Sequence, residues 1–202
     1  MQLRINWLGL AGGVTTLAVI VVSLFYPWWQ LEVGEGLVTA NVSPLNTNFK
    51  VLGTGFTIPL LWAVNMVGVL TLLVSGVTMV IYSLFPVKSY SKTLLCFAYK
   101  KPLYMVVSFV IFLFVSVFLV QALLHFNVPL SGSVNTIFPI PFVQNTTASV
   151  IISAGFQWSF WLMVVAAGLC IAARIYHRRF TVAPKPDVAS TAVAPPTETT
   201  VQ

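Results

Sequence analysis

The chain has 202 residues, of which 58% are hydrophobic and only 7% are charged, and its mean hydropathy is +0.94. Soluble domains carry charges on about a quarter of their residues, so this composition excludes an ordinary soluble domain and indicates an integral membrane protein. The net charge of +6 requires no nucleic-acid partner, because basic residues that face an anionic membrane surface account for it.

Long uncharged intervals predict four membrane-spanning helices. Residues 5–31, 51–87 and 102–173 contain no Asp, Glu, Lys or Arg. About 20 apolar residues cross the hydrocarbon core, so the first two intervals hold one helix each and the third holds two. We therefore predict an all-α membrane protein, a four-helix bundle over residues 1–180 with helices over residues 6–26, 57–84, 102–125 and 149–173, outer loops over 27–56 and 126–148, and an inner loop over 85–101.

The first apolar segment could instead be a cleaved signal peptide. Its apolar run is longer than the roughly 7 to 15 residues of a signal core, and no small-x-small site precedes the aromatic residues 25–29. We therefore expect a retained membrane helix.

The distribution of basic residues predicts the orientation. Nine of the ten Lys and Arg residues lie on the side of the two termini, and only Lys50 lies on the other. Cytoplasmic loops are enriched in Lys and Arg, so we predict a multi-pass protein of the cell membrane with both termini in the cytoplasm. The two N-x-[ST] sequons, at Asn41 and Asn145, both lie in the predicted outer loops and are candidate glycosylation sites.

An aromatic cluster marks the outer end of the first helix. Pro27 disfavours continuation of the helix, so we expect it to end near Tyr26. Aromatic rings with one apolar and one polar side favour the headgroup level of the membrane. This predicts an interfacial position for Tyr26, Trp28 and Trp29.

The residues after this cluster predict a β-hairpin. Trp29, Leu31 and Val33 alternate with polar residues, the segment 34–36 supplies two glycines for a turn, and 37–42 alternates again. Residues 49–52 could add a third strand. We therefore expect a small antiparallel sheet in the first outer loop, with Trp29 at the start of its first strand.

The four crossings, the Pro-x-Trp element and an extracellular sheet together resemble the claudin-like tetraspan architecture over residues 1–175. Trp29 and the Gly36-Leu37 pair are similar to parts of the claudin signature, and Val38 stands where that signature has a second Trp. The chain is also similar in composition to small archaeal four-helix membrane proteins. The resemblance implies a helical bundle that carries an extracellular sheet.

Small residues predict close helix contacts. Gly9 and Gly13 form a GxxxG motif in the first helix, and Gly168 with Ala172 repeats the spacing in the fourth. Such spacing lets backbones approach closely. We expect these residues to join the first and fourth helices.

Three polar side chains lie in the outer halves of the predicted helices: Asn65, Gln121 and Gln157. Hydrogen bonds between helices are their expected role. The alternative is a polar lining for an outward-facing vestibule or a quinone headgroup.

No catalytic constellation is present in the sequence. The two histidines, His125 and His177, fall near opposite membrane faces, which excludes a haem held by both. The two cysteines, Cys96 and Cys170, belong to no metal-ligand spacing. We expect no cofactor, no metal site and no enzymatic activity.

The function that the sequence favours is a non-enzymatic membrane scaffold, either an accessory subunit or an adhesion-type tetraspan protein. One alternative is an oligomeric channel or small-molecule permease. Another is a membrane anchor subunit of a respiratory or redox complex. The expected partners are the lipid bilayer and further copies of the chain or other membrane subunits. Residues 181–202, rich in Ala, Pro and Thr, are expected to form a disordered cytoplasmic tail.

Overall fold

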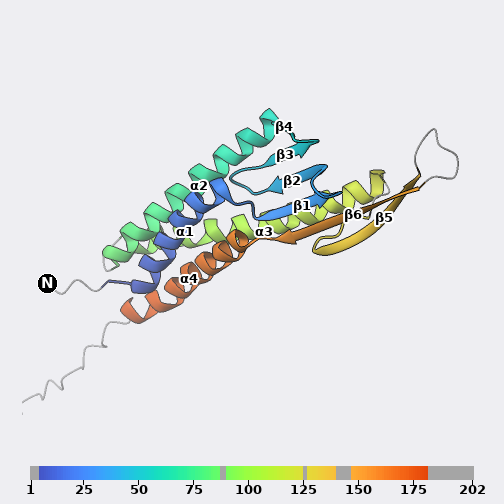
Figure 1. The fold of residues 1–202 in the computed structure, drawn as a ribbon. Helices are drawn as coiled ribbons and strands as arrows, with labels where there is room; N and C mark the ends of the chain where they lie inside the picture. The colour runs from blue at the N-terminus through green and yellow to red at the C-terminus, as the bar shows by residue number, and fades with distance from the viewer. Residues whose placement is uncertain (1–4, 87–89, 125–126, 140–146, 182–202) are drawn as a thin grey trace, which may run out of the picture.

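A computed structural model gives the fold and describes residues 5–86, 90–124, 127–139 and 147–181. Four helices form an elongated bundle with an antiparallel sheet at one end, here called the sheet end (Figure 1). The first helix begins and the last helix ends at the opposite end, here called the termini end. Each helix contains a segment long and apolar enough to cross a membrane. The helices are α1 (Trp7–Phe25), α2 (Pro59–Leu84), α3 (Ser91–Leu124) and α4 (Trp158–Thr181).

The sheet has six strands in the order β4-β3-β2-β1-β6-β5. The predicted hairpin is confirmed, since β1 begins at Trp29 and its last residue pairs with the first of β2. The turn between them holds three residues with positive φ, Gly34 at 61°, Glu35 at 53° and Gly36 at 95°, a conformation that glycine adopts readily. The strands are β1 (Trp29–Val33), β2 (Val38–Val42), β3 (Asn48–Val51), β4 (Thr54–Phe56), β5 (Gly132–Pro139) and β6 (Thr147–Phe156).

The predicted start of the fourth helix is wrong, because residues 149–156 belong to β6 and α4 begins at Trp158. β6 pairs with β1 on one side and with β5 on the other, so its backbone groups are used in ladders rather than in a helix. Its β-branched run Val150, Ile151 and Ile152 suits a strand. The two predicted outer loops, 27–56 and 126–148, therefore both supply strands to one sheet.

The third helix begins at Ser91, so most of the predicted inner loop 85–101 is helical. Its 34 residues make it about 51 Å long, well beyond the thickness of a hydrocarbon core. The helix continues through Pro102, which has no N–H to donate to the carbonyl of Ala98 four residues earlier. The Ser75 hydroxyl of α2 donates to that carbonyl at 2.7 Å. A side chain of a neighbouring helix thus compensates for the proline.

We expect Ser75→Ala to lower the free energy of unfolding by about 1 to 3 kcal/mol, because the buried Ala98 carbonyl would lose its partner. The second variant, Pro102→Ala, restores an N–H to α3. In that background Ser75→Ala should cost clearly less. Thermal unfolding of the four purified proteins in detergent measures this double-mutant cycle, and equal costs in both backgrounds would contradict the assignment.

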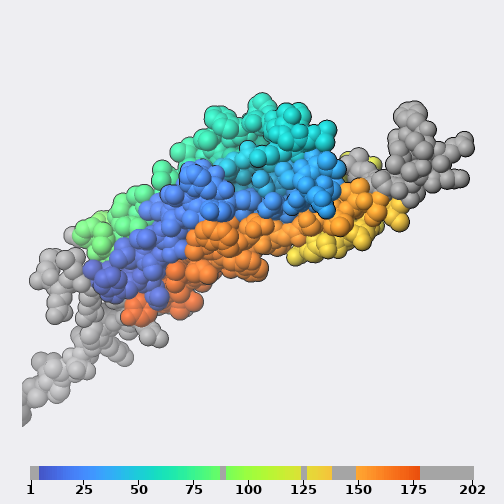
Figure 2. Space-filling model, in the orientation of Figure 1, coloured from blue at the N-terminus to red at the C-terminus, as the bar shows by residue number. Residues whose placement is uncertain are grey.

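The helix contacts differ from the predicted pairing of the two small-residue motifs. α1 lies between α2 and α4 (Figure 2). A Cβ added at Gly13 would meet the backbone nitrogen of Val80 at 3.0 Å, and one at Gly9 would meet the Ser83 hydroxyl, so this GxxxG faces α2. Gly12 makes the close approach to α4, where a Cβ would lie 3.1 Å from the Cys170 nitrogen.

The second motif does not form a close contact at its glycine. Nothing lies within 4 Å of a Cβ added at Gly168, and Ala172 is only partly buried. The prediction that Gly168 joins α4 to α1 is therefore wrong. The turn of α4 that faces α1 carries Cys170 instead, because Gly168 lies on the opposite side of the helix.

The buried side chains form two clusters along the bundle. The larger one lies where the sheet meets the helices and includes Trp28, Trp29 and Phe109. The smaller one lies toward the termini end around Tyr82 and Leu95. Because α3 extends beyond the other helices, its half nearer the sheet end packs on one face of the sheet (Figure 1).

Candidate functional site

The junction between the sheet and the bundle is built on Trp28. Its backbone N–H donates to the Val42 carbonyl at 3.1 Å, and its carbonyl accepts from the Gln157 N–H at 2.9 Å. Its indole Nε1 donates to the Ser23 hydroxyl of α1 at 2.7 Å. One residue therefore connects α1, the end of β2 and the start of α4.

The indole of Trp28 is also packed among aromatic rings. Its centroid lies 5.1 Å from that of Phe109 on α3 and 6.1 Å from that of Phe160 on α4. The side chain is 0% exposed. The predicted interfacial position is therefore wrong for Trp28, because the chain turns at Pro27 and directs this ring between the helices.

The neighbouring aromatic residues take different positions. Trp29 is 3% exposed, and its Nε1 donates to the Leu130 carbonyl at 2.8 Å. It is a buried residue of the sheet, as the strand interpretation requires. Tyr26 is 52% exposed, and its ring lies 5.2 Å from that of Trp158. Of the three predicted interfacial aromatics, only Tyr26 is exposed.

The three predicted intramembrane polar side chains do not meet one another. Asn65 is 7% exposed, and its amide, oriented to satisfy both groups, donates to the Ser43 carbonyl at 3.3 Å and accepts from the Thr47 N–H at 2.9 Å. Gln121 donates to the Val128 carbonyl at 2.9 Å. Asn65 and Gln121 thus bind backbone of the sheet-end segments rather than a neighbouring helix.

Gln157 precedes α4 and is not part of it. Its side chain donates to the Gln30 side chain at 3.4 Å, and its backbone carbonyl accepts from the Phe160 N–H at 3.1 Å. The prediction of hydrogen bonds between helices is therefore wrong for these three residues, because the chain entering and leaving the sheet offers nearer backbone partners.

The two candidate glycosylation sites differ in what the structure describes. Asn41 lies in β2, a strand with a neighbour on each side, and its Oδ1 is buried without a hydrogen-bond partner. This position gives an enzyme poor access to the side chain. Asn145 lies outside the described residues.

The sheet has two edge strands among the described residues, the three-residue β4 and the eight-residue β5. β5 forms the last strand and pairs only with β6. Its eight residues carry no charge, and the side chains of Ser133, Asn135 and Ile137 are exposed. β1 ends opposite Ile152, so the hairpin of β5 and β6 projects beyond the rest of the sheet (Figure 1).

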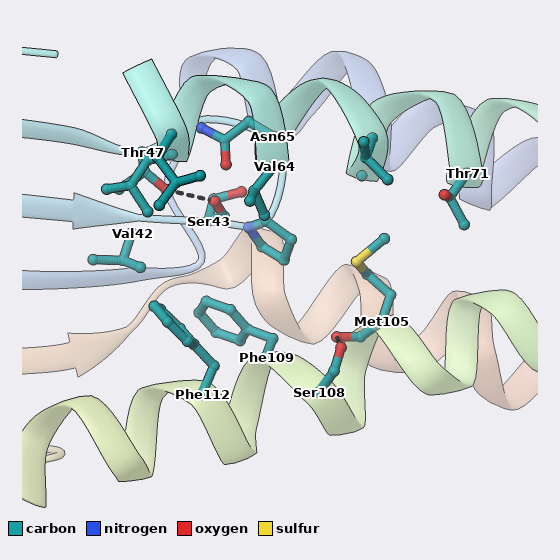
Figure 3. A pocket seen from close by; sticks show the side chains of 15 residues that line it. Val42, Ser43, Thr47, Val64, Asn65, Thr71, Met105, Ser108, Phe109 and Phe112 are labelled. Atoms are coloured by element: carbon teal, nitrogen blue, oxygen red, sulfur yellow. Dashed lines mark hydrogen bonds between the residues drawn. The ribbon is translucent and has the colours of Figure 1, made fainter. Parts of the chain in front are cut away.

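A second feature of the sheet end is a chamber between α2 and α3, with a volume of about 470 Å³ (Figure 3). Its walls are apolar apart from a few hydroxyl groups and the Asn65 amide. A smaller cavity of about 190 Å³ between the sheet and α3 shares Val42, Thr47, Leu61 and Phe112 with it. The lining residues of the chamber are Val42, Ser43, Pro44, Thr47, Leu60, Leu61, Val64, Asn65, Val67, Gly68, Thr71, Met105, Ser108, Phe109 and Phe112.

A buried polar cluster fastens three helices near the termini end. The Asn6 side chain accepts from the Gly9 N–H at 3.2 Å, which caps α1, and donates to the Tyr82 hydroxyl at 3.0 Å. The Tyr82 oxygen lies 2.8 Å from Nδ1 of His177 on α4. His177 therefore has a structural partner, whereas His125 lies outside the described residues.

Within the described residues, no three His, Cys, Asp or Glu side chains are grouped so as to hold a metal ion. No protein-family model matches the chain, and no curated protein matches it in sequence. The features that bear on function are the β5 edge of the sheet and the chamber.

Proposed function

We propose that the protein is a non-enzymatic tetraspan scaffold of the cell membrane, with both termini in the cytoplasm and the sheet outside. The charges of the described residues support this orientation. Lys92, Lys100, Lys101 and Arg174 lie in the parts of α3 and α4 nearer the termini end, whereas the sheet carries only Lys50 and Glu32. Basic residues favour the cytoplasmic side.

The observation that carries the proposal is the six-stranded sheet with the uncharged edge strand β5. Both segments that connect helices at this end contribute strands, and Trp28 fixes the sheet to the bundle through α1 and α4. An unpaired edge strand presents N–H and C=O groups that can pair with a strand of another chain. Proteins usually protect such an edge with Lys, Pro or a bulge; β5 has no Lys, and its one proline, Pro139, is its last residue.

The sheet edge thus suits adhesion or the recruitment of an accessory partner, as in the claudin-like layout that the sequence resembles. A two-stranded ribbon by itself is only marginally stable, so the projecting part of β5 and β6 would gain stability from an added strand. The simplest partner is β5 of a second copy in a facing membrane, because two uncharged edges do not repel each other.

We expect proteoliposomes that carry the full chain to cluster, and we expect Ile137→Lys to reduce that clustering severalfold. Ile137 is 67% exposed on β5, so a lysine there is accommodated in the folded protein but places like charges together when two edges pair. Dynamic light scattering measures cluster growth, after an alkaline wash has shown that the protein is embedded in the vesicles.

The matched control is Thr54→Lys, an exposed position on β4 at the opposite edge of the sheet. This variant should cluster like the wild-type protein. Equal clustering by Ile137→Lys and the wild type would show that the β5 edge is not the contact. Embedded protein that does not cluster would rule out contact between copies in facing membranes.

A further inference from the structure

We propose that the chamber between α2 and α3 binds an acyl chain of an anionic phospholipid from the cytoplasmic leaflet, and that the Lys101 ammonium holds its phosphate. The inference rests on the membrane insertion proposed above. It adds a specific lipid site to the scaffold.

The chamber has the size and chemistry of a lipid-chain site. Its volume of about 470 Å³ lies within the range of about 300 to 1,000 Å³ that is typical of small-molecule pockets. Val64, Val67 and Phe112 line it and are more than half exposed, so the chamber opens sideways between the helices. In a bilayer, that opening faces the acyl chains.

Lys101 lies one helical turn beyond the α3 residues that line the chamber, on the side of the termini end. Met105, Ser108 and Phe112 of α3 line the chamber at helical spacing. Lys101 precedes Met105 by four residues and lies on the same face of α3. Its Nζ lies 5.3 Å from the centroid of the Phe97 ring, so the ammonium reaches a further turn toward the termini end.

No carboxylate balances this cation among the described residues. The described Asp and Glu residues are Glu32 and Glu35, and both lie in or beside the sheet. Lys100 precedes Lys101 directly, and the Arg174 guanidinium lies 5.4 Å from the centroid of the Tyr99 ring on another side of α3, so the surrounding charges are also positive. A cation at membrane depth is costly without a counter-ion, and basic pockets between helices on the cytoplasmic side bind anionic headgroups.

The same end of the chamber offers a free hydroxyl. The hydrogen bond from Ser75 to the Ala98 carbonyl fixes the register of α2 against α3. Thr71 lies four residues from Ser75 along α2, and Lys101 lies three residues from Ala98 along α3, both toward the sheet end. The two residues are therefore at a similar depth along the bundle. Thr71 lines the chamber (Figure 3). Its hydroxyl has no hydrogen-bond partner among the described residues.

These positions match the layout of one lipid. A phospholipid of the cytoplasmic leaflet has its phosphate toward the termini end and its chains toward the sheet end. With the phosphate at Lys101, the Thr71 hydroxyl can donate to an ester carbonyl oxygen, and one chain enters the chamber. A zwitterionic lipid would fill the chamber equally well but would bring no net negative charge to Lys101.

The test is native mass spectrometry of the full chain in detergent with added dioleoyl phosphatidylglycerol or dioleoyl phosphatidylcholine. We expect the wild-type protein to bind phosphatidylglycerol about fivefold more tightly, as one basic contact at a membrane surface provides. Lys101→Gln should abolish this preference and Lys101→Arg should keep it. The matched control, Lys50→Gln in the sheet, should behave like the wild type.

Two further measurements distinguish the contribution of the headgroup from that of the acyl chain. Ser108→Phe fills the chamber and should weaken the binding of both lipids, and water-soluble glycerophosphoglycerol should not displace bound lipid. Equal wild-type affinities, a preference retained by Lys101→Gln, unchanged binding by Ser108→Phe or displacement by the soluble headgroup would each overturn the proposal. Vesicle clustering tests the scaffold proposal in a separate experiment. If the vesicles do not cluster, the lipid-binding results still test the lipid site.

Discussion

Trp28→Ala is expected to lower the free energy of unfolding by about 4 to 5 kcal/mol, near the upper end for a buried aromatic residue. The substitution removes a fully buried indole from its contacts with Phe109 and Phe160, and it leaves the Ser23 hydroxyl without its donor. The ring connects the helices to the segment that leads into the sheet, so the cavity cannot close by a local side-chain shift.

Denaturant unfolding in detergent of Trp28→Ala, Trp28→Phe and Tyr26→Ala distinguishes the contribution of ring packing from that of the hydrogen bond to Ser23. Trp28→Phe keeps an aromatic ring but loses the bond to Ser23, and we expect a cost of about 1 to 2 kcal/mol. Tyr26→Ala, at the exposed neighbouring ring, should cost less than about 1 kcal/mol. Similar small losses for Trp28→Ala and Tyr26→Ala would return Trp28 to the interfacial role that the sequence predicts.

The second large effect is expected for Gly13→Ile, with a loss of about 3 kcal/mol or more. An added Cβ would lie 3.0 Å from the Val80 nitrogen and 3.1 Å from the Gly76 carbonyl oxygen. Both are backbone atoms of α2, so they cannot move aside as a side chain would. The whole of α1 would have to shift, and its contact with α4 would be disturbed as well.

The matched control is Gly168→Ile, which makes the same change in another helix at a position with open space around it. Its effect should be within about 0.5 kcal/mol, because the surroundings are not constrained. Melting temperatures and monodispersity of the purified proteins make the comparison. Equal losses at the two glycines would mean that intrinsic helix preferences, rather than the contact with α2, determine the result.

The parts of the fold that sequence predicts well are those with a strong local signal. The predicted helices over 6–26 and 57–84 agree with α1 and α2 to within a few residues, because Pro27 stops the first helix and Pro59 stands at the first position of the second. The first hairpin also follows from its alternation and from the two glycines of its turn. In these segments, local preference and tertiary structure favour the same conformation.

The errors arise where a distant partner decides the structure. The segment 149–156 is apolar enough for a helix, and only pairing with β1 and β5 makes it a strand. α3 continues through Pro102 because the Ser75 hydroxyl of α2 donates to the Ala98 carbonyl, which Pro102 cannot bond. A small-residue stripe at Gly9, Thr16 and Ser23, spaced by seven, could have indicated the buried face of α1, where Ser23 receives Trp28.

The pairing of β1 with β6 joins residues 29–33 to residues 152–156. During synthesis, β1 can pair with β2 as soon as the segment between α1 and α2 has emerged, but its other edge must wait until α2 and α3 have been made and β6 has followed them. Long-range pairings of this kind form late, and an open edge is prone to wrong partners in the meantime. The sheet can therefore be completed only after most of the chain has been synthesised. Pairing of β1 with β6 is the last step of its assembly, because β6 is translated after the other strands.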